Sequence, residues 1–259
     1  MRFCLKSFFA LLFVFGCPGS ARSQDVAKAP TPEAATAKEP TAEAPQPEVS
    51  VKKVGETLYR IGEIEFDAKS CEIRFPVTVN MKEGGPIEYI LVNEKGKVHE
   101  SIFTTAISPT SLQIAMKLLR FKAGRGDVFN RLLAPEVLEK EGGIEADRGD
   151  SVSFAFRAEG DEKAVPVYEF VIDGESAEVM KPGRWVYTGS AVEGGTFMAE
   201  VEGSIIAIYL DQLALFNMTR VGADLDDRWG IRSSIVPEIG TKGILTIQQD
   251  GKKVVTKEE

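Results

Sequence analysis

The chain contains a single histidine, His99, which is the first candidate for acid–base chemistry near neutral pH. A zinc site with several histidines, or an iron site with two, therefore cannot form within one chain. Four polar residues could join His99 in a ligand-binding site: Glu88, Asn93, Glu100 and Ser101. The segment that contains His99 is predicted to be a strand that leads into a helix.

A strand at this position would decide which of these side chains can act together. Successive side chains of a strand point to opposite faces, so His99 and Ser101 would share one face and Glu100 would lie on the other. His99 and Glu100 would then not form a catalytic pair. His99 and Ser101 would form a base–nucleophile couple only if a third residue oriented the imidazole ring. The alternative is a histidine that is hydrogen-bonded at the surface of a sheet and has no chemical role.

A run of acidic residues, Asp224, Asp226 and Asp227, is the second candidate site, and Asp211 and Asn217 precede it. Clustered carboxylates in an irregular segment can hold Ca²⁺, although this run lacks the glycine and terminal glutamate of an EF-hand loop. In the alternative interpretation, an aspartate caps a turn, the next arginine pairs with an acid and the following tryptophan packs in the core. We expect no resident cofactor, and calcium or zinc is the metal to test at these sites.

Signatures of phosphate binding and of nucleophilic catalysis are absent from the sequence. There is no Walker A run and no Gly-x-Ser-x-Gly elbow, and no second histidine follows His99 at the spacing of a metalloprotease. The net charge of −8 falls entirely on residues 51–259, because residues 1–50 carry five basic and five acidic side chains. An acidic domain repels nucleic acid and anionic lipid, so we expect no nucleic-acid partner.

The pattern after residue 50 predicts an α+β fold that is rich in strands. Ser108 as N-cap and Pro109 as the first helical residue predict one main amphipathic helix, at about 109–121. Apolar residues alternate with polar ones at 71–79, before this helix. Further strands are predicted after it, at Val152–Phe156, Val165–Ile172, Arg184–Thr188, Thr196–Val201, Ser204–Leu210 and Gly243–Gln248. We expect antiparallel sheets packed like a sandwich, in one domain over residues 51–259 with two halves at 51–121 and 151–250.

The N-terminal residues are typical of an export signal. Two basic residues precede an apolar run at 7–16, which is too short to span a bilayer comfortably. Small residues at Ala21 and Ser23 predict cleavage after residue 23, so residues 1–23 would be a signal peptide. In the alternative, the segment ending in Cys17 is a lipobox, and Cys17 would carry a lipid anchor.

Residues 24–50 predict a disordered linker. The segment contains five prolines and seven alanines but no aromatic residue, leucine or isoleucine, so it cannot bury enough apolar surface to fold. The chain is therefore expected to be exported, either to the periplasm or attached to the cell envelope. A lipid on Cys17 would be its only contact with the membrane. Cys71, the one cysteine in the folded part, is predicted to be a small buried residue.

Several segments carry a family resemblance: Ile87–Val92, Gly96–Ser101, the helix that begins at Ser108-Pro109, Trp185–Ser190, Ser204–Ala207 and Val236–Thr241. Together they cover most of Ile61–Ile247, and they resemble the YdjY-like domain family of exported or membrane-associated bacterial proteins. That family is associated with a histidine just before an Ile-Ala step of the helix, where this chain has Gln113. The resemblance implies an exported β-rich domain and does not imply a reaction.

These observations predict a non-catalytic module that binds a small ligand or a protein partner at the cell envelope. The alternative is a metal-assisted or His-dependent hydrolase centred on His99, with carboxylates from residues 224–227. The hydrolase requires those groups to meet in one pocket, whereas the binding module leaves His99 on an ordinary sheet surface. A third alternative is a scaffold that uses an exposed sheet edge as its contact surface.

Overall fold

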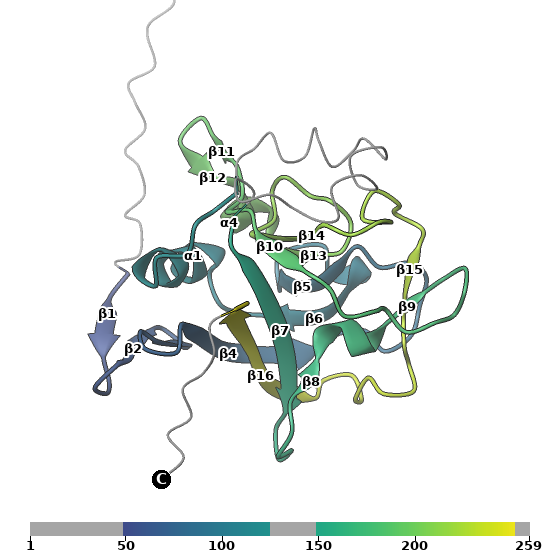
Figure 1. Ribbon diagram of the computed structural model, residues 1–259, viewed down its shortest axis with the longest axis horizontal. Coiled ribbons are helices and arrows are strands. Elements are labelled where there is room, and N and C mark those ends of the chain that lie inside the picture. Colours follow the sequence, from purple (N-terminus) through teal and green to yellow (C-terminus); the bar gives the residue numbers. More distant parts are fainter. Residues whose placement is uncertain (1–48, 125–148, 252–259) are drawn as a thin grey trace, which may run out of the picture. The chain divides into compact units, whose positions relative to one another are not determined.

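The computed structural model describes residues 49–124 and 149–251. The predicted signal peptide, most of the linker and Cys17 lie outside the described residues. Within the described ranges the strands are β1 (Val51–Lys53), β2 (Leu58–Ile61), β3 (Ile64–Asp67), β4 (Glu72–Val79), β5 (Tyr89–Asn93), β6 (Ser101–Thr105), β7 (Ser151–Ala158), β8 (Val165–Pro166), β9 (Val171–Asp173), β10 (Trp185–Tyr187), β11 (Val192–Glu193), β12 (Thr196–Phe197), β13 (Ser204–Ala207), β14 (Phe216–Met218), β15 (Trp229–Ile231) and β16 (Lys242–Gln249). The helices are α1 (Pro109–Leu118), α4 (Met198–Glu202) and the 3₁₀ turns η1 (Val98–Glu100) and η3 (Val167–Phe170). Figure 1 shows their arrangement.

Eight strands close into a barrel, in the order β4, β16, β7, β10, β14, β13, β5, β6 and back to β4. Six of the eight neighbouring pairs are antiparallel. The pairs β13–β14 and β5–β6 are parallel. The β-rich, mostly antiparallel character was predicted correctly, but the sandwich was wrong: the main sheet closes on itself. Closure pairs the edges that an open sheet would leave exposed.

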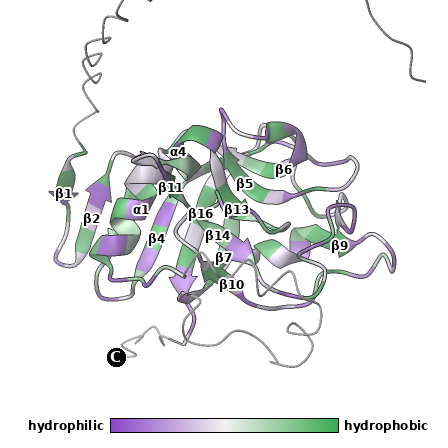
Figure 2. Ribbon diagram, turned by 90° about the horizontal axis from the view of Figure 1, so that it is seen from above, coloured by the Kyte–Doolittle hydropathy of each residue, from purple (hydrophilic) through white to green (hydrophobic). Residues whose placement is uncertain are grey.

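Alternating side chains on the three longest strands of the barrel explain both the prediction and its error. Leu245 of β16 pairs with Phe75 of β4 on one side and with Phe156 of β7 on the other, and all three side chains are buried. Figure 2 shows hydrophobic residues on β5 and β13 as well. A period of two assigns one face of each strand to the core. Because a sandwich and a barrel share that pattern, the period alone cannot distinguish them.

Both predicted halves contribute strands to this one barrel. The segment 51–121 supplies β4, β5 and β6, and the segment 151–250 supplies the other five. One edge of β4 is shared between two neighbours. It pairs with β3 through Glu72–Arg74 and with β6 through Thr78 and Val79. The hairpin strands β1, β2 and β3 thus extend the sheet beyond the barrel (Figure 1).

Helix α1 begins where the sequence predicts. Ser108 Oγ accepts a hydrogen bond from the Ser111 N–H at 3.2 Å and donates one to the Glu200 carboxylate of α4 at 2.8 Å. The helix ends at Leu118, three residues before the predicted end, and Arg120 has the left-handed φ of 63° that commonly follows a helix. Its buried residues join the core, and it contacts β3 and α4. None of the helices in residues 49–124 and 149–251 has the length and hydropathy of a membrane span.

Two predicted strands contain helical turns. The segment Thr196–Val201 forms the short strand β12 and then α4, which ends at Gly203 with a left-handed φ of 71°. The segment Val165–Ile172 forms β8, then η3, then β9. Buried residues of η3 and α4 face the core, so tertiary packing has overridden the local strand preference. Cys71 is buried, as predicted, in the turn before β4.

Candidate functional site

Glu88 and Glu100 come together because each precedes a strand of the same parallel pair. Tyr89 of β5 lies opposite Ser101 of β6, so the residues just before them are neighbours at one rim of the barrel. The Glu88 N–H donates to the Glu100 carbonyl oxygen at 3.1 Å. Parallel pairing brings the start of β6 back to the start of β5.

His99 lies on the 3₁₀ turn η1 and not on a strand, so the predicted separation of His99 and Glu100 was wrong. The chain reverses here to enter β6 parallel to β5, and the Glu100 N–H closes the turn onto the Lys97 carbonyl oxygen at 3.2 Å. His99 Nε2 lies 3.3 Å from Glu100 Oε1, and the imidazole is 73% exposed. The alternative interpretation, a polar surface histidine, describes this exposure better than a catalytic base does.

The other two predicted binding residues lie elsewhere. Ser101 is buried, and its hydroxyl donates to the Phe103 carbonyl oxygen at 2.8 Å. Asn93 lies at the opposite end of β5 from Tyr89. At a rise of about 3.3 Å per residue, the two residues are about 13 Å apart along the strand. The Asn93 amide donates to the Ile107 carbonyl oxygen at 2.9 Å. The structure therefore gathers Glu88, His99 and Glu100, but not Ser101 or Asn93.

Lys97 and Tyr89 complete a strand-start cluster that consists of Glu88, Tyr89, Lys97, His99 and Glu100. Lys97 Nζ lies 3.3 Å from a Glu88 carboxylate oxygen and 5.3 Å from the centroid of the Tyr89 ring. Burial raises the pKa of Glu88; the charge of Lys97 opposes this shift and that of Glu100 adds to it. Burial alone would lower the pKa of Lys97, but Tyr89 and Glu88 outweigh it and the pKa is raised. The positive charge of Lys97 is thus paired with the carboxylate of Glu88 inside the cluster.

A hydrogen-bond network behind the cluster ties Tyr89 to three other segments. The Tyr89 hydroxyl donates to Asp211 Oδ2 at 2.9 Å, and burial, followed by the Asp211 charge, raises the pKa of Tyr89. Asn217 accepts from the Asp211 N–H at 2.8 Å and donates to the Thr188 hydroxyl at 2.8 Å. Asp211 and Asn217, which precede the predicted calcium run, therefore bond to the protein itself. Their role here is structural.

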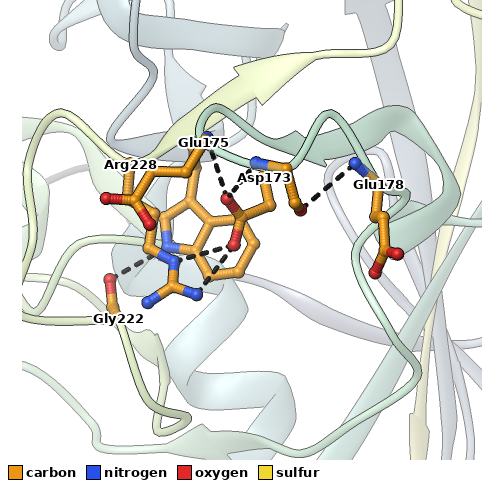
Figure 3. A network of polar contacts seen from close by, with 7 residues as sticks. Asp173, Glu175, Glu178, Gly222 and Arg228 are labelled. Atoms are coloured by element: carbon orange, nitrogen blue, oxygen red, sulfur yellow. Dashed lines mark hydrogen bonds and ion pairs between the residues drawn. The ribbon is translucent and has the colours of Figure 1, made fainter.

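The acidic run after β14 follows the alternative interpretation. Arg228 donates from Nε and from one terminal nitrogen to Asp173 Oδ2, at 3.0 and 2.7 Å (Figure 3). Trp229 is buried, and its indole N–H donates to the Gly222 carbonyl oxygen at 2.9 Å. Asp226 and Asp227 are exposed. The pairing of the arginine with an acid and the burial of the tryptophan were thus predicted correctly.

The described part of the chain does not assemble a ligand set for a metal. Across residues 49–124 and 149–251, no three side chains of the types His, Cys, Asp and Glu are placed to hold an ion together. Asp224, Asp226 and Asp227 accordingly do not form such a set, either by themselves or with His99. The convergence that the hydrolase interpretation requires is not seen in this part of the chain.

A groove of about 560 Å³ on the outer wall of the barrel was not anticipated from the sequence. Its floor is formed by outward-facing side chains of three adjacent strands: Glu72 and Arg74 of β4, Thr246 and Gln248 of β16, and Ser153 and Ala155 of β7. The strand register places these side chains in two rows, Glu72–Gln248–Ser153 and Arg74–Thr246–Ala155. We call this feature the wall groove. Its remaining lining residues are Phe154, Ala164, Pro166, Tyr168, Pro182, Gly183 and Trp185.

Glu72 gives the floor of the wall groove a buried charge. The residue is only 8% exposed, and its carboxylate accepts a hydrogen bond from Gln248 Nε2 at 2.8 Å and forms an ion pair with Arg74. Arg74 is half exposed and presents donors toward solvent. The only sequence signal was a polar side chain at most of the outward positions, Ala155 being the exception. That signal is also typical of an ordinary solvated face.

The YdjY domain family matches residues 64–248 of this chain. The chain belongs to that family. The match extends from β3 almost to the end of β16 and therefore covers the barrel and both sites described above. No curated protein and no solved structure matches the chain. Gln113 of this YdjY domain donates to the Gly189 carbonyl oxygen at 3.2 Å.

Proposed function

We propose that this YdjY domain is a non-catalytic module of the cell envelope that binds a small ligand in the wall groove. The observation that carries the proposal is the groove itself. Its volume lies in the range of about 300–1,000 Å³ that is usual for small-molecule sites. Such sites combine apolar walls with a few convergent polar groups. The wall groove has this composition, with Tyr168 and Pro166 on one side and the carboxylate, guanidinium and amide of the floor below.

Binding is the favoured class because the floor is built to be rigid. Its side chains project from long, fully paired strands, and Glu72 is fixed by two partners. Rigid elements hold polar groups in place without further ordering when a ligand arrives. The lining contains no histidine or cysteine. Its single serine, Ser153, would have no histidine base among these residues.

NMR of the full-length chain tests this proposal directly. We expect a charge-balanced set of small organic compounds to shift the amide signals of Ser153, Ala155, Thr246 and Gln248 more than those elsewhere. Ala155→Trp should abolish these shifts, because an indole at a half-buried lining position would fill the groove. Arg157→Trp is the matched control, since Arg157 is exposed, lies two residues further along β7 and is not part of the lining. Shifts that persist in Ala155→Trp would reject the wall groove as the site.

The His-dependent hydrolase remains the second proposal and rests on one contact, that of His99 with Glu100 at 3.3 Å. Glu100 could orient the imidazole in the way that a triad carboxylate does. The nearest candidate nucleophile in sequence, Ser101, is buried and already bonded to a carbonyl oxygen. Hydrolysis of a broad panel of ester and amide substrates that disappears in His99→Ala would favour this second function.

Export to the envelope is part of the proposal and is supported by the N-terminal sequence. Mass spectrometry of the chain recovered from a bacterial host distinguishes the two forms of export. A mature chain that begins at Gln24 would indicate cleavage of a signal peptide. A mature chain that begins at a lipidated Cys17 would indicate anchoring through a lipid. An intact N-terminus on a cytoplasmic chain would contradict both.

A further inference from the structure

A partly buried arginine lies directly behind the rim of the wall groove. The side chain of Arg220, which follows β14, lies so close to Gly183 that an added Cβ there would be 2.6 Å from its Cδ and 2.8 Å from its Nε. The guanidinium also lies 5.8 Å from the centroid of the Trp185 ring. Gly183 and Trp185 both line the groove. Two lining residues therefore also contact Arg220, which places this cation next to the space where a ligand would lie.

Arg220 has no acidic partner in the described part of the chain. Its terminal nitrogens donate to the Lys181 carbonyl oxygen and, at 3.2 Å, to Met180 Sδ, both of which are uncharged acceptors. Its Nε is buried and finds no hydrogen-bond partner among residues 49–124 and 149–251. Burial lowers the pKa of Arg220 to about 10, so the guanidinium remains charged at neutral pH. A desolvated cation without a counter-charge is costly to the fold.

The charges around the groove leave this cation in excess. Glu72 and Arg74, the lining residues charged at neutral pH, form an ion pair with each other. Lys181 and Arg184 flank Pro182 and Gly183 in sequence, whereas Glu162 and Glu169 lie close in sequence to the lining residues Ala164 and Tyr168. Among the described residues, Arg220 is thus the cation next to the groove that has no counter-charge, on a chain whose net charge is −8. The groove therefore provides an environment that favours an anion.

We propose that the wall groove selects a small organic carboxylate and that Arg220 supplies the charge that selects it. This inference rests on the proposed function, because it assigns a ligand class to the same groove. The carboxylate would lie over Gly183 and face the guanidinium across the glycine backbone. The apolar part of the ligand would lie against Tyr168 and Pro166. At a few ångströms and an effective dielectric well below that of water, such an interaction is strong enough to discriminate between ligands.

Matched acid and amide pairs test the selection of charge. Each pair has nearly the same shape, so a difference in affinity reports the charge alone: benzoate and benzamide, hexanoate and hexanamide, and N-acetylglycine and N-acetylglycinamide. We expect each acid to bind the full-length chain about tenfold more tightly than its amide, as measured by the groove amide shifts. In Arg220→Met the preference should fall to about threefold or less. Arg157→Met, which removes an exposed arginine outside the groove, should leave it unchanged.

The wild-type chain provides a test that does not depend on how Arg220→Met folds. Raising the salt concentration should weaken binding of the acids and leave that of the amides unchanged. Equal affinity of acids and amides at the groove would overturn the carboxylate inference and leave the proposed function intact. If neither member of any pair shifts the groove signals, although neutral or cationic compounds do, the carboxylate inference alone fails. If no compound of any charge shifts them, both proposals fail.

Discussion

Two arginines of this domain lie over tryptophan rings, and they differ in how their charge is balanced. Arg228 lies 5.1 Å from the Trp229 centroid and makes two hydrogen bonds to Asp173. Arg220 lies 5.8 Å from the Trp185 centroid and donates only to a carbonyl oxygen and a thioether. Both arginines contact a tryptophan ring. They differ because only Arg228 has a carboxylate partner, Asp173, among the described residues.

The difference shows which region has a purely structural role. At the Arg228 site, Asp173 also accepts hydrogen bonds from the N–H groups of Glu175 and Ser176, so the charges of Arg228 and Asp173 are both compensated within the fold (Figure 3). At the Arg220 site a buried charge is left over, and it adjoins a groove. A fold gains stability from the first arrangement and loses some through the second. A partner that is present only when a ligand is bound would explain why the second arrangement is kept.

The largest effect is expected from removing the compensated arginine. Arg228→Met should lower the free energy of unfolding by about 2 kcal/mol, because Asp173 would keep its partly buried charge without its strongest partner. Hydrogen bonds from Arg228 are the main reason that the pKa of Asp173 is lowered. The stability that Asp173 contributes is therefore present above about pH 4 and is lost as the pH falls through its folded pKa. The difference between wild type and variant, measured by urea unfolding, should shrink in acid.

Arg220→Met is the matched control for that prediction. Without ligand, it should unfold within about 0.5 kcal/mol of wild type, or be more stable, because the loss of two hydrogen bonds to uncharged acceptors is offset by the removal of an uncompensated charge. A loss as large as that of Arg228→Met would mean that Arg220 is as structural as Arg228. The proposed difference between the Arg220 and Arg228 sites would then be wrong.

A smaller loss is expected in the network behind the strand-start cluster. Tyr89→Phe removes the hydroxyl that donates to Asp211 Oδ2 and should cost about 1.5 kcal/mol. Tyr209→Phe also removes a hydroxyl from a half-buried side chain, but that hydroxyl has no hydrogen bond to the described residues. Tyr209→Phe should cost less than about 0.5 kcal/mol. Thermal unfolding of the two variants and of the wild type measures both losses. Equal losses would show that the bond to Asp211 does not stabilise the fold.

Local features of the sequence were sufficient to predict individual elements. The Ser108 cap, the helix start at Pro109 and the alternation along β4 and β16 all depend on residues within one turn or one strand. Barrel closure depends instead on which strands pair, and β4 reaches β16 across more than 150 residues of sequence. The parallel pairing of β5 and β6 likewise cannot be predicted from the alternation of their residues. For this reason His99 was wrongly predicted to lie on a strand.

The candidate sites show the same limit. The contact between Glu88 and Glu100 follows from the parallel register, and the floor of the wall groove is built from three strands that lie far apart in sequence. Nothing local marks Arg220 as unpaired, because an acid anywhere in the chain could have reached it. For Arg228, the sequence could predict the type of its partner but not which residue it would be. The sequence indicated an acid partner but not Asp173, which is 55 residues away.

The pH dependence of stability should separate the strand-start cluster from the Arg228 site. Burial raises the folded pKa of Glu88 above the unfolded value of 4.5, so Glu88 favours the folded state at low pH. That contribution is present below about pH 4.5 and is lost as the pH rises through the folded pKa. Glu88→Gln should remove this decline in a series of unfolding midpoints from pH 4 to neutral. Glu63→Gln, at an exposed position, should leave the decline in place.

The smallest effect is expected at His99, the residue with the strongest chemical signal in the sequence. Its side chain is 73% exposed and its one contact is with Glu100, so His99→Ala should change the free energy of unfolding by less than about 0.5 kcal/mol. The same variant should also keep the preference of the wall groove for acids over amides, since its segment is not part of the groove lining. Urea unfolding and the acid–amide titrations check the two expectations on one sample. A change in acid preference without a change in stability would place His99 in the binding function and contradict the assignment of that function to the groove alone.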